Sequence, residues 1–365
     1  MKKILIFSLI FCIICASILA ITACGERDID NSDSFTSDEE NNGIKNEENN
    51  GIKKNESIGL EFVSNDDGTC YVGGIGSCTD KNIVFPLASP DGDVVTSIAN
   101  HAFLSNNDIE SIVVPEGVTR IGAYAFSECI NLLTVIIPDS VVVLGQSAFS
   151  GCEKLESVKM SQNIINIEDY TFAECRNLKS ITLYRSIYSI GYRAFDHCTS
   201  LREIIIPESV SVIEGYAFMG CENLTSMTIP QSVTEIGGGV FAWCDNLTNI
   251  SVDSRNAMFV SMNNCIIYEN EIIAVCNEFT IPSNAGITSI GKYAIAGVSA
   301  TNITIPENIT NLDFMCIAGC TDLKDIFYEG TTNDWASITK DNHWFMNNAD
   351  CSSIHCTDEI ISTAS

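Results

Sequence analysis

Cysteine is the residue type whose spacing most strongly suggests chemistry in this sequence of 365 residues. Thiols that recur at a fixed interval could form a ladder of disulfides or bind metal ions. Seven thiols cannot all pair with neighbours, however, and a free cysteine is a small residue that is usually buried. We therefore predict a column of free, buried thiols, formed by six cysteines that stand 23 residues apart and a seventh that returns to the same position of the pattern: Cys129, Cys152, Cys175, Cys198, Cys221, Cys244 and Cys320.

Residues near the two ends of the chain could also do thiol or metal chemistry. Cys70 and Cys78 could form a disulfide if the strands that carry them pair, and the same question is open for Cys351 and Cys356. The only cluster that resembles a set of metal ligands consists of His343, Cys351, His355 and Cys356. Two of its members are adjacent, and this spacing fits no compact zinc site. We predict no metal site and no cofactor, and we expect His355 and Cys356 to lie on opposite faces of a final short strand.

Catalytic motifs have no counterpart in the sequence. No Ser/His/Asp arrangement, glycine-rich phosphate loop or HExxH motif is recognisable, and of the four histidines we place His101 and His197 on the surface. The formal net charge of −28 disfavours nucleic acid as a partner. This acidity is spread over the part of the chain that is expected to fold, where it favours a soluble, self-repelling surface. We predict that the protein is not an enzyme.

The cysteines belong to a repeat of 23 residues, which must position them. Two of its copies read IGAYAFSECINLLTVIIPDSVVV and IGYRAFDHCTSLREIIIPESVSV. A fixed period of this length indicates a solenoid, in which each repeat forms one coil stacked on the last. The alternating apolar residues predict a strand, and the proline ends it because proline lacks the N–H that a ladder needs.

The phrase IGxxAFxxCxxLxxIxIPxSV resembles the BspA-like leucine-rich repeats of bacterial and protist surface proteins, from about Leu60 to Cys356. NDDGTCYVGGIG is similar to the N-terminal hairpin of that family, and FYEGTTNDWASI is similar to its C-terminal cap. The resemblance implies an α/β-type leucine-rich-repeat solenoid that is rich in β structure. We expect about nine coils of 23 residues, with one parallel sheet and short helical or 3-10 turns opposite.

The start of the chain has the features of an export signal. Two lysines and an apolar run over residues 4–21 describe a secretory signal peptide. The cysteine that follows Ile-Thr-Ala resembles the cleavage box of bacterial lipoproteins, in which this thiol carries diacylglycerol. The resemblance implies that Cys24 is the lipid attachment site and that the lipid is the only contact with the membrane. An ordinary signal peptide with a chance cysteine is the alternative.

The chain divides into five predicted segments. Low hydrophobicity and excess charge predict that the second segment is disordered. Within the repeats, residues 253–280 break the period and form an enlarged coil, with a hairpin expected around Glu269-Asn270. Such an insertion is either part of a binding face or a tolerated irregularity. The segments are a lipoprotein signal peptide (1–23), an acidic linker (24–57), an N-terminal cap (58–97), the leucine-rich repeats (98–326), and a C-terminal cap and tail (327–365).

A candidate binding face follows from the strand of each repeat. Two residues of every strand point outward, and in successive coils they form two columns that are rich in hydroxyl groups with isolated Val and Ile. This face could bind a protein or glycan through many weak contacts, or it could be an ordinary solvated sheet face. The predicted residues are Ser111, Val113, Thr134, Ile136, Ser157, Lys159, Ser180, Thr182, Glu203, Ile205, Ser226, Thr228, Asn249 and Ser251.

The family resemblance also implies a function. Members are similar to cell-surface adhesins and are not known as enzymes. The resemblance implies a protein that is exported and lipid-anchored at the cell surface, where it mediates adhesion or protein–protein binding. The expected partners are host extracellular-matrix or cell-surface proteins, or other bacterial surface proteins. The resemblance transfers no residue-level site. The alternative is a structural surface-layer or envelope assembly protein without a dedicated ligand.

Overall fold

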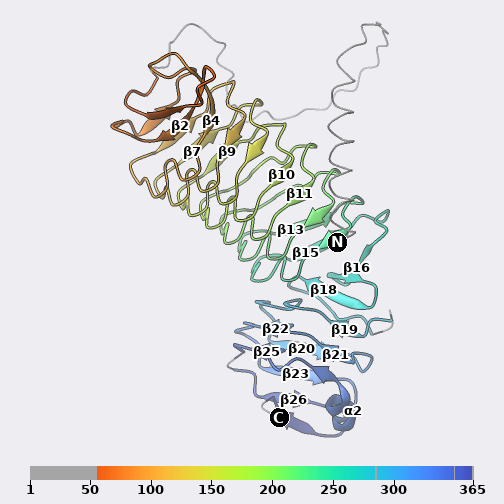
Figure 1. Cartoon of the computed structure of the whole chain (residues 1–365). Helices are drawn as coiled ribbons and strands as arrows, with labels where there is room; N and C mark the ends of the chain where they lie inside the picture. Colours follow the sequence, from red (N-terminus) through yellow and green to blue (C-terminus); the bar gives the residue numbers. More distant parts are fainter. Residues whose placement is uncertain (1–55, 284–285, 349, 364–365) are drawn as a thin grey trace, which may run out of the picture. The chain divides into compact units, whose positions relative to one another are not determined.

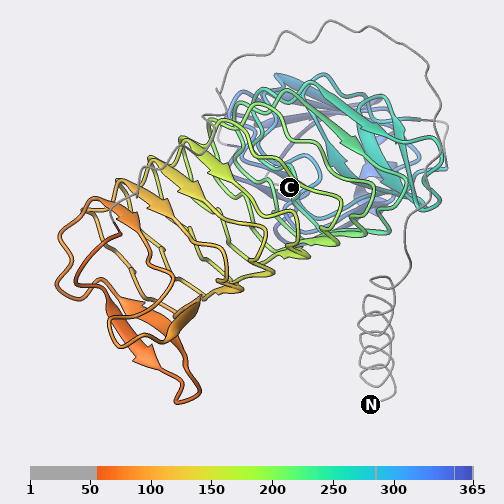
Figure 2. The same ribbon diagram turned by 90° about the horizontal axis from the view of Figure 1, so that it is seen from above.

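The computed structural model describes residues 56–283, 286–348 and 350–363. They belong to one compact unit, Lys54–Ser365, in which successive coils stack on one another (Figures 1 and 2). The predicted signal peptide, Cys24 and all but the last two residues of the predicted linker lie outside the described residues. In the described part of the chain, no helix is long and apolar enough to cross a membrane.

The longer strands of the coils form the first parallel ladder. Partners in this ladder stand 23 residues apart in the regular coils, as Ser111 and Thr134 do. Four strands form its first part, two its second, and three with an antiparallel end strand its third. In order, these are β3 (Asn82–Val84), β5 (Ser111–Val113), β7 (Thr134–Ile136) and β9 (Ser157–Lys159); β13 (Ser226–Ile229) and β15 (Asn249–Val252); and β20 (Asn302–Ile305), β23 (Asp325–Tyr328), β26 (Ser353–His355) and β27 (Ile360–Ser362).

A second parallel ladder consists of short strands that close the coils. It extends an N-terminal hairpin, in which β1 (Glu61–Ser64) pairs with β2 (Thr69–Gly74) around Asp66-Asp67-Gly68, in the segment whose resemblance to the family implies a hairpin. That hairpin prediction is confirmed. The other members are β4 (Val94–Ile98), β6 (Arg120–Ile121), β8 (Val143–Leu144), β10 (Asn166–Ile167), β11 (Ser189–Ile190), β12 (Val212–Ile213), β14 (Glu235–Ile236), β19 (Ser289–Ile290), β21 (Asn311–Leu312) and β24 (Thr339–Lys340).

The remaining side of each coil, which we name the turn side, is neither helical nor 3-10. Its N–H groups bond alternately to carbonyl groups of the next coil, as Phe126 N–H does to Ala148 O at 2.9 Å, and to the carbonyl three residues earlier, as Cys129 N–H does to Phe126 O at 3.3 Å. The i→i−4 bonds of a helix therefore do not form. Two residues per turn, such as Tyr124 (φ 56°) and Glu128 (φ 60°), are left-handed and also interrupt a helix. The solenoid is confirmed, but the side that was expected to hold short helical or 3-10 turns holds non-helical turns, and the expected single parallel sheet is two ladders. The only helix in the described residues is α2 (Thr332–Ser337), after the coil that contains β23.

The solenoid has about 11 turns, compared with the expected nine, because strands of both predicted caps join the ladders. The inward columns of the regular coils are filled as the repeat predicts. Adjacent phenylalanine rings stack in parallel, for example Phe103 on Phe126 at 5.1 Å between centroids. In the coil that starts at Ile121, eight side chains are at most 1% exposed: Ile121, Ala125, Phe126, Cys129, Leu132, Val135, Ile137 and Val141.

The insertion at 253–280 is an antiparallel meander of β16 (Phe259–Met262), β17 (Cys265–Tyr268) and β18 (Glu271–Val275). Tyr268 pairs with Glu271, so the hairpin predicted around Glu269-Asn270 is confirmed. The meander contributes side chains to two separate core clusters, with Ile266 in the first and Ile267 in the second. On the turn side, the coils before and after the meander still contact each other directly, because Trp243 N–H donates to Ala296 O at 3.2 Å.

Candidate binding surface

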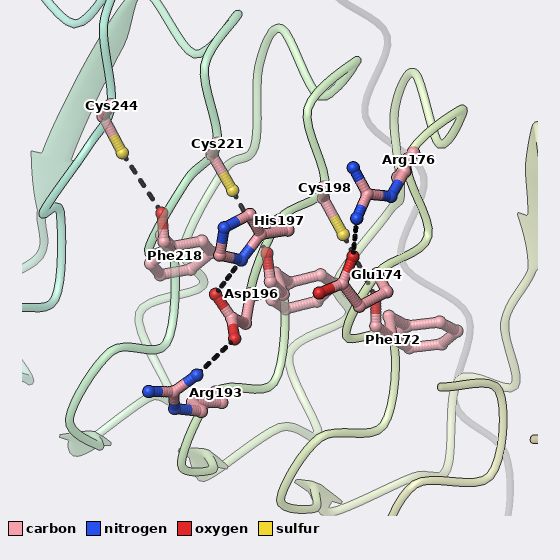
Figure 3. A network of polar contacts seen from close by, with 11 residues as sticks. Phe172, Glu174, Arg176, Arg193, Asp196, His197, Cys198, Phe218, Cys221 and Cys244 are labelled. Carbon is pink, nitrogen blue, oxygen red and sulfur yellow. Dashed lines mark hydrogen bonds and ion pairs between the residues drawn. The ribbon is translucent and has the colours of Figure 1, made fainter. Parts of the chain in front are cut away.

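The cysteine column has a structural role in the packing of the coils. Each thiol of the column donates a hydrogen bond to a backbone carbonyl of an earlier coil, as Cys198 Sγ does to Phe172 O at 3.2 Å and Cys244 Sγ to Phe218 O at 3.1 Å (Figure 3). Burial raises the pKa of the Cys129 thiol to about 12 and that of Cys175 well above its ordinary value. A buried thiol that stays protonated is a poor nucleophile. The prediction of free, buried thiols is confirmed for all seven cysteines.

The cysteines near the ends are also free thiols, so the structure has neither a Cys70–Cys78 nor a Cys351–Cys356 disulfide. Within the described residues, no group of three or more His, Cys, Asp or Glu is arranged to hold a metal ion. His355 stacks on Phe327 at 4.7 Å, and its Nε2 lies 2.8 Å from Asp325 Oδ1. These contacts, together with the pairing of His355 with Phe327 across β23 and β26, place His355 on the outward face of β26.

The structure places all fourteen residues of the candidate binding face on the outer surface of the coils, which we name the strand face. Eleven are exposed, and Ser111, Val113 and Ser251 are half-buried. Neighbouring hydroxyl groups bond to each other across coils, as Thr228 and Ser251 do at 3.0 Å. The outward direction of these side chains is therefore as expected, and the face is polar along most of its length.

The strand face opens in its middle. Residues 179–183 and 202–206 do not form strands, although both segments have the alternating pattern. Between them, the described backbone shows a single hydrogen bond, from Arg202 N–H to Lys179 O at 3.3 Å. A groove of about 530 Å³ lies at this opening, and Ile205 beside it is 83% exposed. The groove is lined by apolar and charged side chains that include Leu183, Arg185, Glu203, Ile206, Glu208 and Asp253.

A polar network on the turn side has a structural role. Asp196 is buried and accepts from Arg193 Nη1 at 2.8 Å, and its other oxygen lies 2.6 Å from His197 Nδ1 (Figure 3). The His197 ring covers Gly220 of the next coil so closely that a Cβ there would lie 3.0 Å from the ring. His197 is half-exposed, which agrees in part with the surface position that we predicted. The hydrogen bonds of this network lie within one coil, and the His197 ring packs on the next coil.

Sequence reasoning missed a line of aromatic rings on the turn side. It begins at Tyr170, which contacts Tyr192 at 5.5 Å, and continues to Tyr216. Arg193 lies over two of these rings, 5.7 Å from the Tyr192 centroid and 5.1 Å from that of Tyr216. The only sequence signal was the recurrence of Tyr at the third or fourth position of several repeats.

Comparisons with known proteins agree with this architecture. A leucine rich cell surface protein from Faecalibacterium prausnitzii has a similar structure, with a TM-score of 0.67 and 23% identity over 81% of this chain and 86% of that protein. A leucine-rich repeat protein from Bacteroides ovatus matches with a TM-score of 0.55 and 24% identity over 81% of this chain and 69% of that protein. Both likenesses support the fold. The search of curated proteins found no match.

The family model described as the BspA type leucine rich repeat region matches in six copies, over residues 96–198, 165–272 and 259–364. These ranges include most strands of both ladders, the cysteine column and the meander. The chain therefore belongs to the BspA type leucine rich repeat family.

Proposed function

We propose that this chain is a cell-surface protein whose strand face binds a protein partner. The observation that carries the proposal is the opening in the strand face, where the exposed Ile205 side chain lies beside a groove of about 530 Å³. An apolar centre with a polar rim is the usual composition of a protein interface. The surrounding hydroxyl and amide groups supply such a rim. The proposed partners are host extracellular-matrix or cell-surface proteins, or surface proteins of other bacteria.

The test is a pull-down with the full chain carrying Cys24→Ser, so that no lipid is attached, against extracts of host matrix, host cells and neighbouring bacteria. A captured protein is then tested against an Ile205→Asp variant, which we expect to bind at least about tenfold more weakly, since a charge in the centre of an interface is costly. Ile165→Asp is the matched control, because Ile165 is 51% exposed and lies outside the strand face. Equal weakening by both variants would count against the strand face.

We also propose that the chain is anchored by lipid on Cys24, as its resemblance to the lipoprotein box implies. Bacteria fed a labelled fatty acid should label the unchanged protein and not the Cys24→Ser variant. The variant should also leave the membrane fraction, since the lipid supplies the anchor. If deletion of the gene alters the envelope without loss of adhesion or of any captured partner, the protein has the structural, surface-layer role instead.

A further inference from the structure

The aromatic rings of the turn side continue well beyond Arg193 and form one unbroken line. Each ring meets the next edge to face, at interplanar angles of 63–86° and centroid distances of 5.2–5.8 Å. This geometry is the one that aromatic pairs prefer. We name this line the aromatic stripe, and its members are Tyr170, Tyr192, Tyr216, Tyr293, Phe314 and His343.

Glycine keeps the stripe continuous across the insertion. The coil between Tyr216 and Tyr293 carries no aromatic ring at this position and has Gly239 (φ +68°) instead. A Cβ on Gly239 would lie 2.6 Å from Tyr216 Cε1, so only glycine lets this ring cross the coil and reach Tyr293 at 5.2 Å. Tyr216 and Tyr293, which are neighbours in the stripe, are thus 77 positions apart in the sequence.

The stripe borders an apolar cluster that is separate from both core clusters. Its buried members are Met219, Ala242, Ala296 and Ala318, and they pack under five half-buried side chains: Tyr216, Trp243, Tyr293, Met315 and Met346. Tyrosine, tryptophan and methionine are enriched in the centres of protein interfaces relative to ordinary surface. This part of the turn side therefore has the composition of a binding surface rather than that of a solvated turn.

Carboxylates lie beside the rings. Asp169 Oδ1 accepts from Tyr192 N–H at 2.9 Å, Asp313 Oδ1 from Phe314 N–H at 2.7 Å, and Asp341 Oδ1 from His343 N–H at 2.8 Å. Each of these bonds fixes a negative group next to an aromatic ring. A ring face and a nearby carboxylate both attract a cation, and their effects combine.

A small cavity beside the stripe adds to this negative character. Its volume is about 180 Å³, and it is lined by Ile236, Gly238, Glu271, Ile273, Lys292 and Asp313. Burial and the nearby Asp313 raise the pKa of Glu271, and Lys292 opposes this effect only in part. The surroundings of Glu271 therefore disfavour its charged form, and a cation supplied from outside would stabilise that carboxylate.

Arg193 shows how a cation binds here, since its guanidinium lies over Tyr192 and Tyr216 and is held by Asp196. Apart from Arg193, the described residues have one other cation–ring contact, between Lys340 and Trp335. The rings from Tyr293 onward are thus uncovered by basic groups of the described chain. The unneutralised part of the stripe is its second half.

We infer that the aromatic stripe from Tyr293 to His343, which Tyr216 supports by packing against Tyr293, binds a lysine- or arginine-rich segment of another protein. Charge complementarity selects this occupant, because the stripe combines ring faces with carboxylates in a chain of net charge −28. The same charge disfavours a second copy of this chain. The surface lies on the turn side, so the inference does not rest on the partner proposed for the strand face.

The test measures the affinity of the full chain carrying Cys24→Ser for a deca-arginine peptide. Replacement of two rings, in Tyr216→Leu/Tyr293→Leu, should weaken binding about tenfold, whereas Tyr216→Phe/Tyr293→Phe, which keeps the ring faces, should retain it. Neither variant changes the net charge, so long-range attraction of the peptide to an acidic protein is the same in all of them. Ile205→Ser on the strand face is the control and should bind as the unchanged protein does. An unchanged affinity in the leucine variant would overturn the inference.

Hydrogen exchange of the chain without ring substitutions covers the case in which the leucine variant fails to fold. Bound peptide should protect backbone N–H groups in residues 214–219 and 291–296, which carry two of the rings. Protection confined to residues 134–136 and 203–206 of the strand face would overturn the inference. Sedimentation could also detect a concentration-dependent dimer. If the leucine variant abolishes that dimer, a second copy of this chain occupies the stripe, and the inference is overturned.

Discussion

The strand face and the turn side are formed by the same repeat, but their side chains differ in how much they contact the neighbouring coils. On the strand face, outward side chains are mostly exposed, up to 83% for Ile205, and they meet the next coil only through contacts such as the bond between Thr228 and Ser251. On the turn side, left-handed residues direct side chains onto the next coil, so that Trp243 covers Gly297 and Gly319. Substitutions on the strand face can therefore change binding without altering the fold. Substitutions on the turn side alter both, because the stripe is also a contact between coils.

The largest effect should come from adding one methyl group on the turn side. Gly297 and Gly286 have nearly the same φ, +72° and +71°, but a Cβ on Gly297 would lie 2.5 Å from Trp243 Cδ1, whereas a Cβ on Gly286 meets no atom within 4 Å. We expect Gly297→Ala to lower the free energy of unfolding by about 2 kcal/mol more than Gly286→Ala does. Urea unfolding measures the difference. Equal losses would show that the turn side is as tolerant as an open loop.

A smaller difference in the free energy of unfolding is expected between loss of a buried hydrogen bond of the cysteine column and loss of an exposed hydrogen bond on the strand face. Cys175→Ala removes a buried thiol donor to Phe149 O at 3.2 Å, and we expect a loss of about 1 kcal/mol, because this carbonyl still accepts from Cys152 N–H. Ser251→Ala removes a hydroxyl bond on the strand face, to Thr228 at 3.0 Å, where water can replace it. Its expected cost is within about 0.5 kcal/mol. Similar values for both variants would contradict the assigned role of the cysteine column.

The cysteine column also makes stability depend on pH. Burial raises the pKa of Cys129 to about 12 from its ordinary value of 9.0, so the native thiol stays protonated where the unfolded thiol ionises. The contribution of Cys129 is complete below about pH 9 and is lost as pH rises toward 12, at about 1.4 kcal/mol for each pH unit, and the other thiols of the column act in the same direction. Urea unfolding at pH 8 and 10 checks the direction. The slope should be smaller in Cys175→Ala, and a slope that does not change would contradict it.

The smallest effect on the fold should come from the strand face. Ile205→Ser should change the free energy of unfolding by less than about 0.5 kcal/mol, because its side chain is largely in water already. The same variant should weaken any partner that the strand face captures. A large loss of stability would mean that Ile205 supports the opened coils rather than a partner.

The inward columns could be predicted from the sequence, because one residue type recurs at each position. The fourteen outward residues followed from the same alternation. The opening at residues 179–183 and 202–206 could not be predicted, since both segments alternate like the coils that do pair. The aromatic stripe was hidden because Tyr192 and Phe314 occupy the third position of their repeats and Tyr170 and Tyr216 the fourth. The left-handed turns had one signal, the glycines at the eighth position, such as Gly151 and Gly220.

The most direct test of the two-surface account is a crossed binding experiment on the full chain carrying Cys24→Ser. The Ile205→Asp and Tyr216→Leu/Tyr293→Leu variants are each measured against a protein captured by the strand face and against the deca-arginine peptide. The account predicts that the first variant loses only the captured protein and that the second loses about tenfold in affinity for the peptide alone. If both variants weaken both ligands to the same extent, the strand face and the aromatic stripe are not separate binding surfaces.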